Sequence, residues 1–179
     1  KSVCIILMQL GEEEKAIELA EKAKEIDSED YTYEYLIGTA YVALRQYDES
    51  IAHLEKALEL APNHSQIYGN LGTAYLLKND QTKSIEMYKK AIEIFPKQPN
   101  AYQLLGNLYT NLGRIEEGMD EYKKVLHFAQ NDAQTYVLLG NAHYLNNEIE
   151  KAIGSYKAAI DIQPENDEFK LVYYQIMDE

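Results

Sequence analysis

Four glycines of this chain, Gly38, Gly72, Gly106 and Gly140, are each separated from the next by 34 residues. The residues around them are nearly the same each time and read IGTAY, LGTAY, LGNLY and LGNAHY. Further rows keep this spacing, with an apolar residue before each glycine, two rows of small residues and a set of closing prolines: Ile37, Leu71, Leu105 and Leu139; Ser50, Ser84, Gly118 and Ala152; Ala57, Ala91, Val125 and Ala159; Pro62, Pro96 and Pro164. A fixed period of this length indicates that one short structural unit is repeated along the chain.

Each unit is predicted to form two helices joined by a short turn. In residues 65–98, Tyr68, Leu71 and Tyr75 recur at helical spacing, so they form one apolar stripe. The residues KND at 78–80 favour a turn. Ser84 and Tyr88 then begin a second helical stripe, which is expected to end before the proline of that unit. Period-two alternation is not sustained anywhere in the chain, so no strands are expected.

A glycine inside a predicted helix needs a packing reason, because it costs about 1 kcal/mol relative to alanine. Gly72 on the first helix and the small Ser84 on the second suit a close crossing of the two backbones. We therefore expect the two helices of a unit to approach each other closely at the glycine.

These features together resemble the tetratricopeptide repeat, whose unit has an aromatic residue, then Leu-Gly, then Tyr, small residues and a closing proline. The resemblance covers the whole chain as a single array over 1–179, with full repeats at 31–64, 65–98, 99–132 and 133–166, a partial repeat at 1–30 and a terminal helix at 167–179. It implies an all-α fold, an α-solenoid in which antiparallel helix pairs form a right-handed superhelix. The aromatic row departs from the pattern at Glu34, where Tyr33 or Tyr35 could supply the ring.

The resemblance also implies that the first helix of each repeat lines a concave groove. Positions two, five, nine and twelve of the repeat form a helical stripe separate from the packing positions. None of the sixteen residues at these positions is charged, although 26% of the chain is. The residues predicted to contact a partner in the groove are Tyr35, Thr39, Val42, Thr73, Leu76, Gln103, Asn107, Thr110, Asn141 and Tyr144.

A neutral groove of amides, hydroxyls and apolar side chains suits an extended peptide of a partner protein. Asn107 and Asn141 can each donate to and accept from a peptide backbone, as asparagines do in some members of the family. Other members hold a C-terminal carboxylate with cationic side chains, but the corresponding positions here carry no cation. The chain is therefore interpreted as a non-enzymatic scaffold that binds a peptide segment, without a carboxylate clamp.

Composition excludes several other classes of function. A formal net charge of −13 argues against a nucleic-acid partner, because binding phosphates needs a clustered positive field. The apolar run at 3–10 is too short for membrane insertion. The four histidines lack metal-ligand spacing, and Cys4, at the glycine position of the partial repeat, is expected to be a small buried hydrophobe. No phosphate loop, nucleophile motif or zinc signature occurs, so no metal, cofactor or catalytic residue is predicted.

The two ends of the chain favour alternative functions. The segment FKLVYYQIM at 169–177 is apolar on nearly all sides, so we expect either that more chain follows it or that the ends pack against another copy. The second alternative predicts self-association, such as a homodimer through the terminal helices. The chain would then be a structural assembly module that uses its ends and convex face. Alternatively, it is the accessory region of a longer enzyme. Because the chain starts with Lys rather than Met, we expect its true N-terminus to be missing; a soluble, cytoplasmic location is favoured, with the compartment left open.

Overall fold

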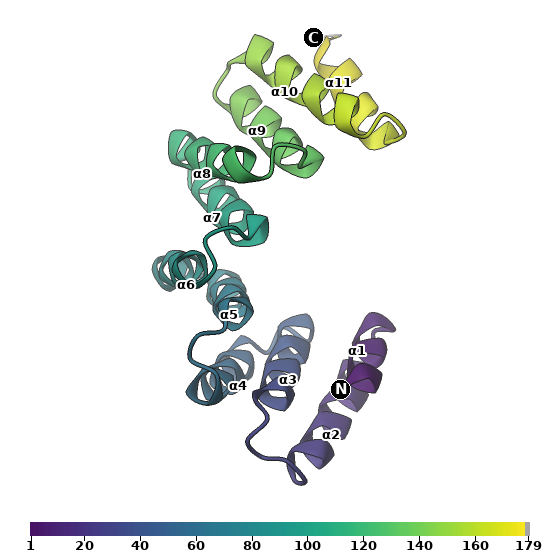
Figure 1. The fold of residues 1–179 in the computed structure, drawn as a ribbon, viewed down its shortest axis with the longest axis vertical. Helices are drawn as coiled ribbons and strands as arrows, with labels where there is room; N and C mark the ends of the chain where they lie inside the picture. The colour runs from purple at the N-terminus through teal and green to yellow at the C-terminus, as the bar shows by residue number, and fades with distance from the viewer. Residues whose placement is uncertain (178–179) are drawn as a thin grey trace. The chain divides into compact units, whose positions relative to one another are not determined.

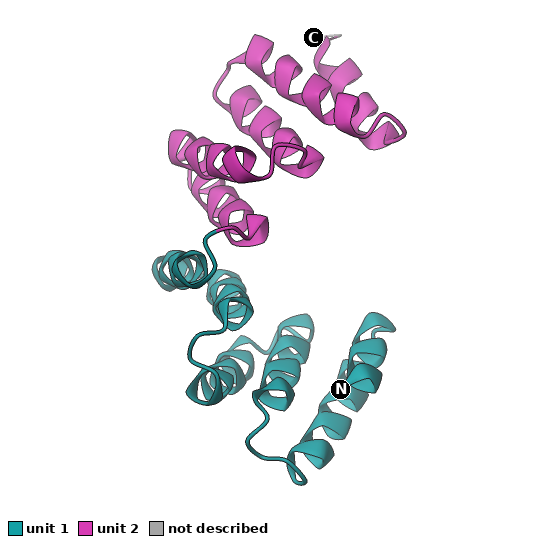
Figure 2. Ribbon diagram, viewed as in Figure 1, with its two compact units in different colours: residues 1–96 teal, residues 97–179 magenta. Residues whose placement is uncertain are grey.

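A computed structural model describes residues 1–177, which contain eleven α-helices and no β-strand. The chain divides into two compact units, residues 1–96 and residues 97–179 (Figure 2). The first unit holds α1 (Ser2–Gln9), α2 (Glu13–Lys24), α3 (Tyr31–Ala43), α4 (Tyr47–Leu60), α5 (Ser65–Leu77) and α6 (Gln81–Ile94). The second holds α7 (Pro99–Asn111), α8 (Ile115–Phe128), α9 (Ala133–Leu145), α10 (Ile149–Ile162) and α11 (Asp167–Met177). The predicted all-α class is confirmed.

Within each unit, successive helices pack side by side as pairs (Figure 1). The pairs α3–α4, α5–α6, α7–α8 and α9–α10 fall inside the four predicted 34-residue repeats. The turn between the two helices of each pair contains one residue with positive φ, and these residues also recur every 34 positions: Gly11, Arg45, Asn79, Gly113 and Asn147, with φ between 60° and 75°. Glycine and asparagine adopt this left-handed conformation easily, whereas arginine does so at a cost.

Three of the four repeated glycines make room for a tyrosine ring on the second helix, and Gly38 makes room for Leu54. A Cβ built on Gly72 would lie 2.5 Å from Cε1 of Tyr88, which is fully buried on α6. The expected crossing partner, Ser84, is buried as well but is not among the atoms nearest to that Cβ. The close approach predicted at the glycine is therefore present, with the tyrosine ring nearest to it at Gly72. The row of Ser84 takes part as well, because a Cβ built on Gly118 would lie 2.8 Å from the carbonyl oxygen of Gly106.

Glu34 takes the place of an aromatic residue in the first unit and is buried between helices. Its carboxylate lies 2.6 Å from Nδ1 of His53 on α4 and 3.3 Å from Nζ of Lys24 on α2. Burial alone would raise the pKa of this carboxyl, but the two partners outweigh it and hold the pKa below its usual value of 4.5. The neighbouring Tyr33 and Tyr35 pack against two different core clusters, so neither fills the position of Glu34.

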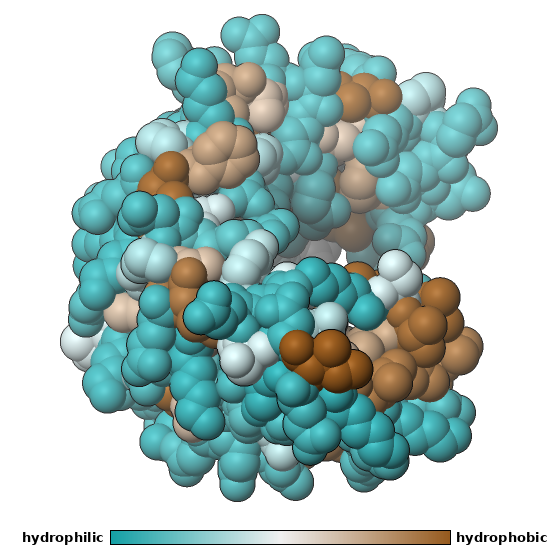
Figure 3. All heavy atoms as spheres, turned by 60° about the horizontal axis from the view of Figure 1, so that its bottom comes forward, coloured by the Kyte–Doolittle hydropathy of each residue, from teal (hydrophilic) through white to brown (hydrophobic). Residues whose placement is uncertain are grey.

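The core of the first unit begins at α1. Cys4 is only 1% exposed and packs with Ala16, Ala20 and Ile37, which confirms its predicted role as a small buried hydrophobe. The other face of α1 carries exposed apolar side chains, at Val3, Ile5, Ile6 and Leu10, which form a hydrophobic patch (Figure 3).

The core of the second unit closes on α11. Phe169 and Ile176 are the buried residues of this helix, and they pack against residues of α9 and α10. Leu171, Tyr174 and Met177 remain more than half exposed. Over residues 1–177, none of the helices combines the length and the apolar composition that a bilayer crossing requires.

Candidate functional site

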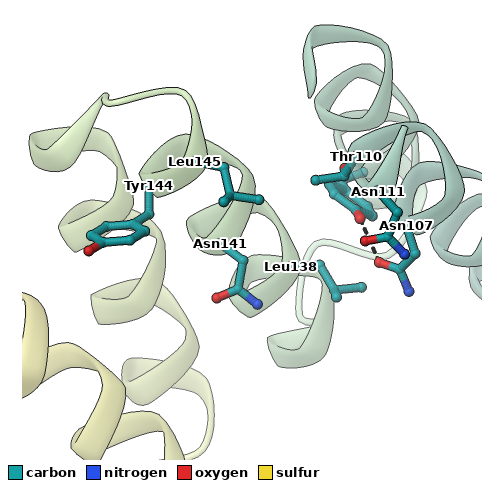
Figure 4. Close-up of a pocket in the computed structure, with 8 residues that line it drawn as sticks. Asn107, Thr110, Asn111, Leu138, Asn141, Tyr144 and Leu145 are labelled. Atoms are coloured by element: carbon teal, nitrogen blue, oxygen red, sulfur yellow. Dashed lines mark hydrogen bonds between the residues drawn. The ribbon is translucent and has the colours of Figure 1, made fainter. Parts of the chain in front are cut away.

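A hollow of about 430 Å³ lies on the second unit, between α7 and α9 (Figure 4). Its lining is Asn107, Thr110, Asn111, Tyr122, Leu138, Asn141, Tyr144 and Leu145. Four of these are residues predicted from the sequence to contact a partner, and none of the eight is charged. We call this hollow the asparagine pocket.

Asn107 is held in the asparagine pocket by a side chain of the neighbouring helix. The hydroxyl of Tyr122 on α8 donates a hydrogen bond of 2.6 Å to Oδ1 of Asn107 (Figure 4). The ring of Tyr122 is 1% exposed and lies under Gly106, where a Cβ would approach its Cε1 to 2.5 Å. Burial raises the pKa of this phenol, so the hydroxyl keeps its proton and acts as a donor at neutral pH.

Asn141 repeats this arrangement in the next helix pair. The hydroxyl of Tyr156 on α10 donates to Oδ1 of Asn141, and the Tyr156 ring is 1% exposed beneath Gly140. Burial raises the pKa of Tyr156 to about 12. In the part of the chain that the structure describes, the Nδ2 atoms of both asparagines form no hydrogen bond, which leaves their N–H groups available.

The apolar part of the lining comes from α9. Leu138 points toward Asn107, whereas Tyr144 lies on the opposite side of α9, away from α7 (Figure 4). Leu145 is 59% exposed, so its side chain is accessible to a ligand. Tyr144 and Leu145 also line a second hollow of about 620 Å³ together with Asn147, Ile149 and Ile176.

Two predicted contact residues of the second unit are engaged in internal hydrogen bonds. Nε2 of Gln103 donates to Oδ2 of Asp132 at 2.8 Å and to Oγ1 of Thr135 at 2.7 Å, which links α7 to the start of α9. Oγ1 of Thr110 donates to the carbonyl of Gly106 at 2.8 Å. Gln103 therefore joins neighbouring repeats, and Thr110 contributes mainly its methyl group to the pocket.

The remaining predicted contact residues lie on α3 and α5 of the first unit. Thr39 donates to the carbonyl of Tyr35 and accepts a 2.9 Å hydrogen bond from Nδ2 of Asn70. Thr73 donates to the carbonyl of Gly69, and its Oγ1 lies 3.2 Å from the hydroxyl of Tyr88.

The apolar predicted residues of the first unit are partly buried. Tyr35 and Val42 pack against the core cluster around Leu54 and Leu71, while Leu76 is half-buried at the end of α5. This part of the predicted site thus offers hydroxyls and apolar atoms, whereas the second unit offers two amides.

The tyrosines that hold the asparagines were not predicted as part of the site. Leu54, Tyr88, Tyr122 and Tyr156 recur every 34 residues, so the row was present in the sequence. Each lies fifteen positions after the ninth residue of its repeat, and this separation joins a first helix to its second helix. The spacing places only Tyr88 of this row, on the stripe of a second helix, and does not show that its hydroxyl reaches the ninth residue of the first helix.

The histidines have structural surroundings. His53 and His143 each lie 2.6 Å from a glutamate through Nδ1, the partners being Glu34 and Glu148. The ring of His64 packs at a tilt of 48° against the ring of Tyr31, with ring centroids 5.0 Å apart. Among residues 1–177, no group of three His, Cys, Asp or Glu side chains could hold a metal ion.

Comparison with known protein families identifies the class of the chain. Models of the tetratricopeptide repeat match residues 5–30, 29–97, 87–119 and 133–166. The chain therefore belongs to the tetratricopeptide repeat family, as the 34-residue period indicates. No curated protein sequence matches the chain.

Several solved structures share the fold. YrrB, described as a TPR protein with an unusual peptide-binding site, is 25% identical, with a TM-score of 0.70 over 94% of this chain and 87% of YrrB. A thermophilic TPR protein of Thermus thermophilus is 16% identical, with a TM-score of 0.78 over 99% of this chain and 97% of its own. MamA from Desulfovibrio magneticus RS-1 is 19% identical, with a TM-score of 0.76 over 93% of this chain and 94% of its own.

Proposed function

We propose that this protein is a non-enzymatic scaffold that binds an extended, uncharged segment of a partner protein in the asparagine pocket. The observation that carries the proposal is the lining: two asparagine amides from successive helix pairs, with apolar side chains beside them and no charge. An extended peptide presents polar backbone groups in alternation with side chains. The amides would bind its backbone, and Leu138 and Leu145 would contact an apolar side chain.

The chemistry of the pocket supports a neutral contact. A charged side chain of the partner would have to lose water without gaining an opposite charge, which is unfavourable. The chain as a whole carries a net charge of −13, so basic residues flanking the bound segment would be favoured at longer range. The likeness to YrrB, which is described as having an unusual peptide-binding site, adds support to peptide as the ligand class.

The proposal is tested with a peptide selected from a random-sequence display library against the wild-type protein. Its Kd is then measured by fluorescence anisotropy with Asn107→Asp and Asn141→Asp. Aspartate keeps an acceptor for the tyrosine hydroxyl but removes the N–H groups, whereas alanine would also leave a buried hydroxyl unpaired. We expect each substitution to weaken binding about 2- to 12-fold per lost hydrogen bond.

Asn131→Asp is the matched control, because Asn131 is exposed in the turn before α9 and is not part of the pocket lining. It makes the same chemical change and adds the same charge in the same unit. If the selected peptide binds both pocket variants as tightly as it binds this control, the proposed site is wrong. The proposal is also overturned if selection yields no binding peptide.

A second candidate function is self-association through the terminal helices. It is favoured by the exposed apolar residues of α1 and by Leu171, Tyr174 and Met177 on α11. Sedimentation at micromolar concentrations should then show a dimer, and Leu171→Glu with Tyr174→Glu should return it to a monomer. A wild-type protein that remains monomeric over this range would rule out this candidate.

A further inference from the structure

We infer that Tyr122 and Tyr156 are positioning residues that fix the amides of Asn107 and Asn141 with their N–H groups turned into the asparagine pocket, so that the pocket binds carbonyl oxygens of its ligand. This inference rests on the proposed function and specifies the chemistry that the site recognises. A freely rotating asparagine offers either an oxygen or a nitrogen to a ligand. A locked pair directs its N–H donors toward the ligand, with one lone pair of each Oδ1 already taken by a tyrosine hydroxyl.

The orientation follows from which atom the tyrosine hydroxyl reaches. In both helix pairs the hydroxyl donates to Oδ1, so one lone pair of that oxygen is already used within the protein and the oxygen faces the tyrosine. If the amide were turned over, its NH₂ group would face the phenol. The phenol O–H would then lose Oδ1 as its hydrogen-bond acceptor. Because both rings are 1% exposed, water cannot readily replace the lost acceptor.

The rings themselves cannot swing away to release the amides. The ring of Tyr122 fills the space beside Gly106. A Cβ built on Gly140 would lie 3.0 to 3.1 Å from three carbon atoms of the Tyr156 ring. Each hydroxyl is therefore fixed by the packing of its ring. The packing of the ring in the core in this way determines which side of the asparagine amide faces the pocket.

The equivalent positions of the first unit show what is particular to this pair. Tyr88 lies under Thr73, whose hydroxyl can donate or accept. In the repeat of Thr39 the tyrosine is replaced by Leu54, whose side chain has no polar atom. Two successive locked amides thus occur at Asn107 and Asn141. The ligand that fits them has carbonyl acceptors on neighbouring residues, as an extended peptide backbone does, and direct contact by a lysine ammonium, a donor, is disfavoured.

The first test uses the wild-type protein and two small probes. N-acetyl-N-methylleucine dimethylamide has two carbonyl acceptors and no N–H group, whereas N-acetylleucine methylamide has the same acceptors and two N–H donors. Each is titrated while the ¹⁵N–¹H signals of the asparagine side-chain amides are followed by NMR. We expect both probes to shift the signals of Asn107 and Asn141, with Kd values within about threefold of each other.

Binding of the donor-bearing probe alone would mean that the asparagines present their oxygens, and it would overturn the inference. Binding of neither probe at the two asparagines would also overturn it.

The second test removes the hydroxyls and keeps the rings. The double variant Tyr122→Phe, Tyr156→Phe should bind the library-selected peptide at least about fivefold more weakly, because the amides are no longer held as donors. Tyr88→Phe is the matched control, since it removes the same hydroxyl beneath Thr73 in the other unit, and should leave the Kd unchanged. Circular dichroism melting shows that each variant is folded at the temperature of the assay, and the single variants replace the double one if it is not.

The outcomes separate this inference from the proposed function. If the phenylalanine variant binds like wild type while Asn107→Asp and Asn141→Asp do not, the orienting role is wrong and the peptide site stands. If neither kind of substitution changes the Kd, the peptide site itself is wrong.

Discussion

Replacing Gly106 with alanine tests whether the tyrosine rings, rather than the glycines alone, determine how the helices of a pair meet. Alanine improves helix propensity by about 1 kcal/mol. Its Cβ would, however, lie 2.5 Å from Cε1 and 3.0 Å from Cδ1 of Tyr122, a ring that is 1% exposed. Overpacking of this kind costs about 1–3 kcal/mol, and displacing the ring also strains the hydrogen bond to Asn107, worth about 1 kcal/mol. The expected net destabilisation is about 1–3 kcal/mol.

Gly154→Ala is the matched control, because Gly154 lies inside α10 of the same unit and a Cβ there would meet no atom within 4 Å. It should stabilise the protein by about 0.5–1 kcal/mol, so the two variants differ in sign. Urea unfolding followed by circular dichroism at 222 nm measures both changes. A Gly106→Ala variant that is as stable as Gly154→Ala would refute the packing account and, with it, the rigid placement of the Tyr122 hydroxyl.

Three further predictions concern single residues away from the pocket. Arg45 has φ 60°, so Arg45→Gly should raise the melting temperature by relieving a strain of about 1–2 kcal/mol, and a lower melting temperature would contradict this. Burial acts to raise the pKa of Glu34, but His53 and Lys24 outweigh this effect and hold the pKa below 4.5. The carboxylate should therefore stabilise the fold fully above pH 4.5 and lose this stabilisation as the pH falls. The urea midpoints of wild type and Glu34→Gln should accordingly converge in acid. The Glu148 carboxyl should titrate with a pKa of about 2 by ¹³C NMR, because Lys151 hydrogen-bonds to it, and Lys151→Ala should raise that pKa.

The fold was predictable because the same packing residues recur in each 34-residue repeat. The positions of Gly38 and its counterparts predict the helix pairs, and the same register predicts that Cys4 lies in the core, where the structure has it. The register was less informative where one copy departs from the others. Glu34 is buried with His53 and Lys24, a polar solution that depends on three separate helices and has no counterpart in the other repeats.

The site was only partly predictable for a different physical reason. Helical spacing places Asn107 and Asn141 at the same position of the equivalent stripes on α7 and α9, and both residues line the pocket between these helices. Spacing along one helix does not reveal which side chain of the second helix contacts the stripe. The hydrogen bonds from Tyr122 and Tyr156 to the two asparagines were therefore missed. It also does not reveal that Gln103 is occupied by Asp132 and Thr135.

The hydrogen bond between the ninth residue of a repeat and the tyrosine fifteen positions later also constrains how such a protein can evolve. A change at Asn107 alters the surroundings of a buried hydroxyl, and a change at Tyr122 alters a group that faces the ligand. A tyrosine at the core position is therefore expected to require a ninth residue that carries an oxygen, as in Thr73 with Tyr88 and Asn107 with Tyr122, whereas Leu54 in the repeat of Thr39 makes no such demand. New ligand preferences in this scaffold would then arise at the ninth residue, within the limits that the core residue sets.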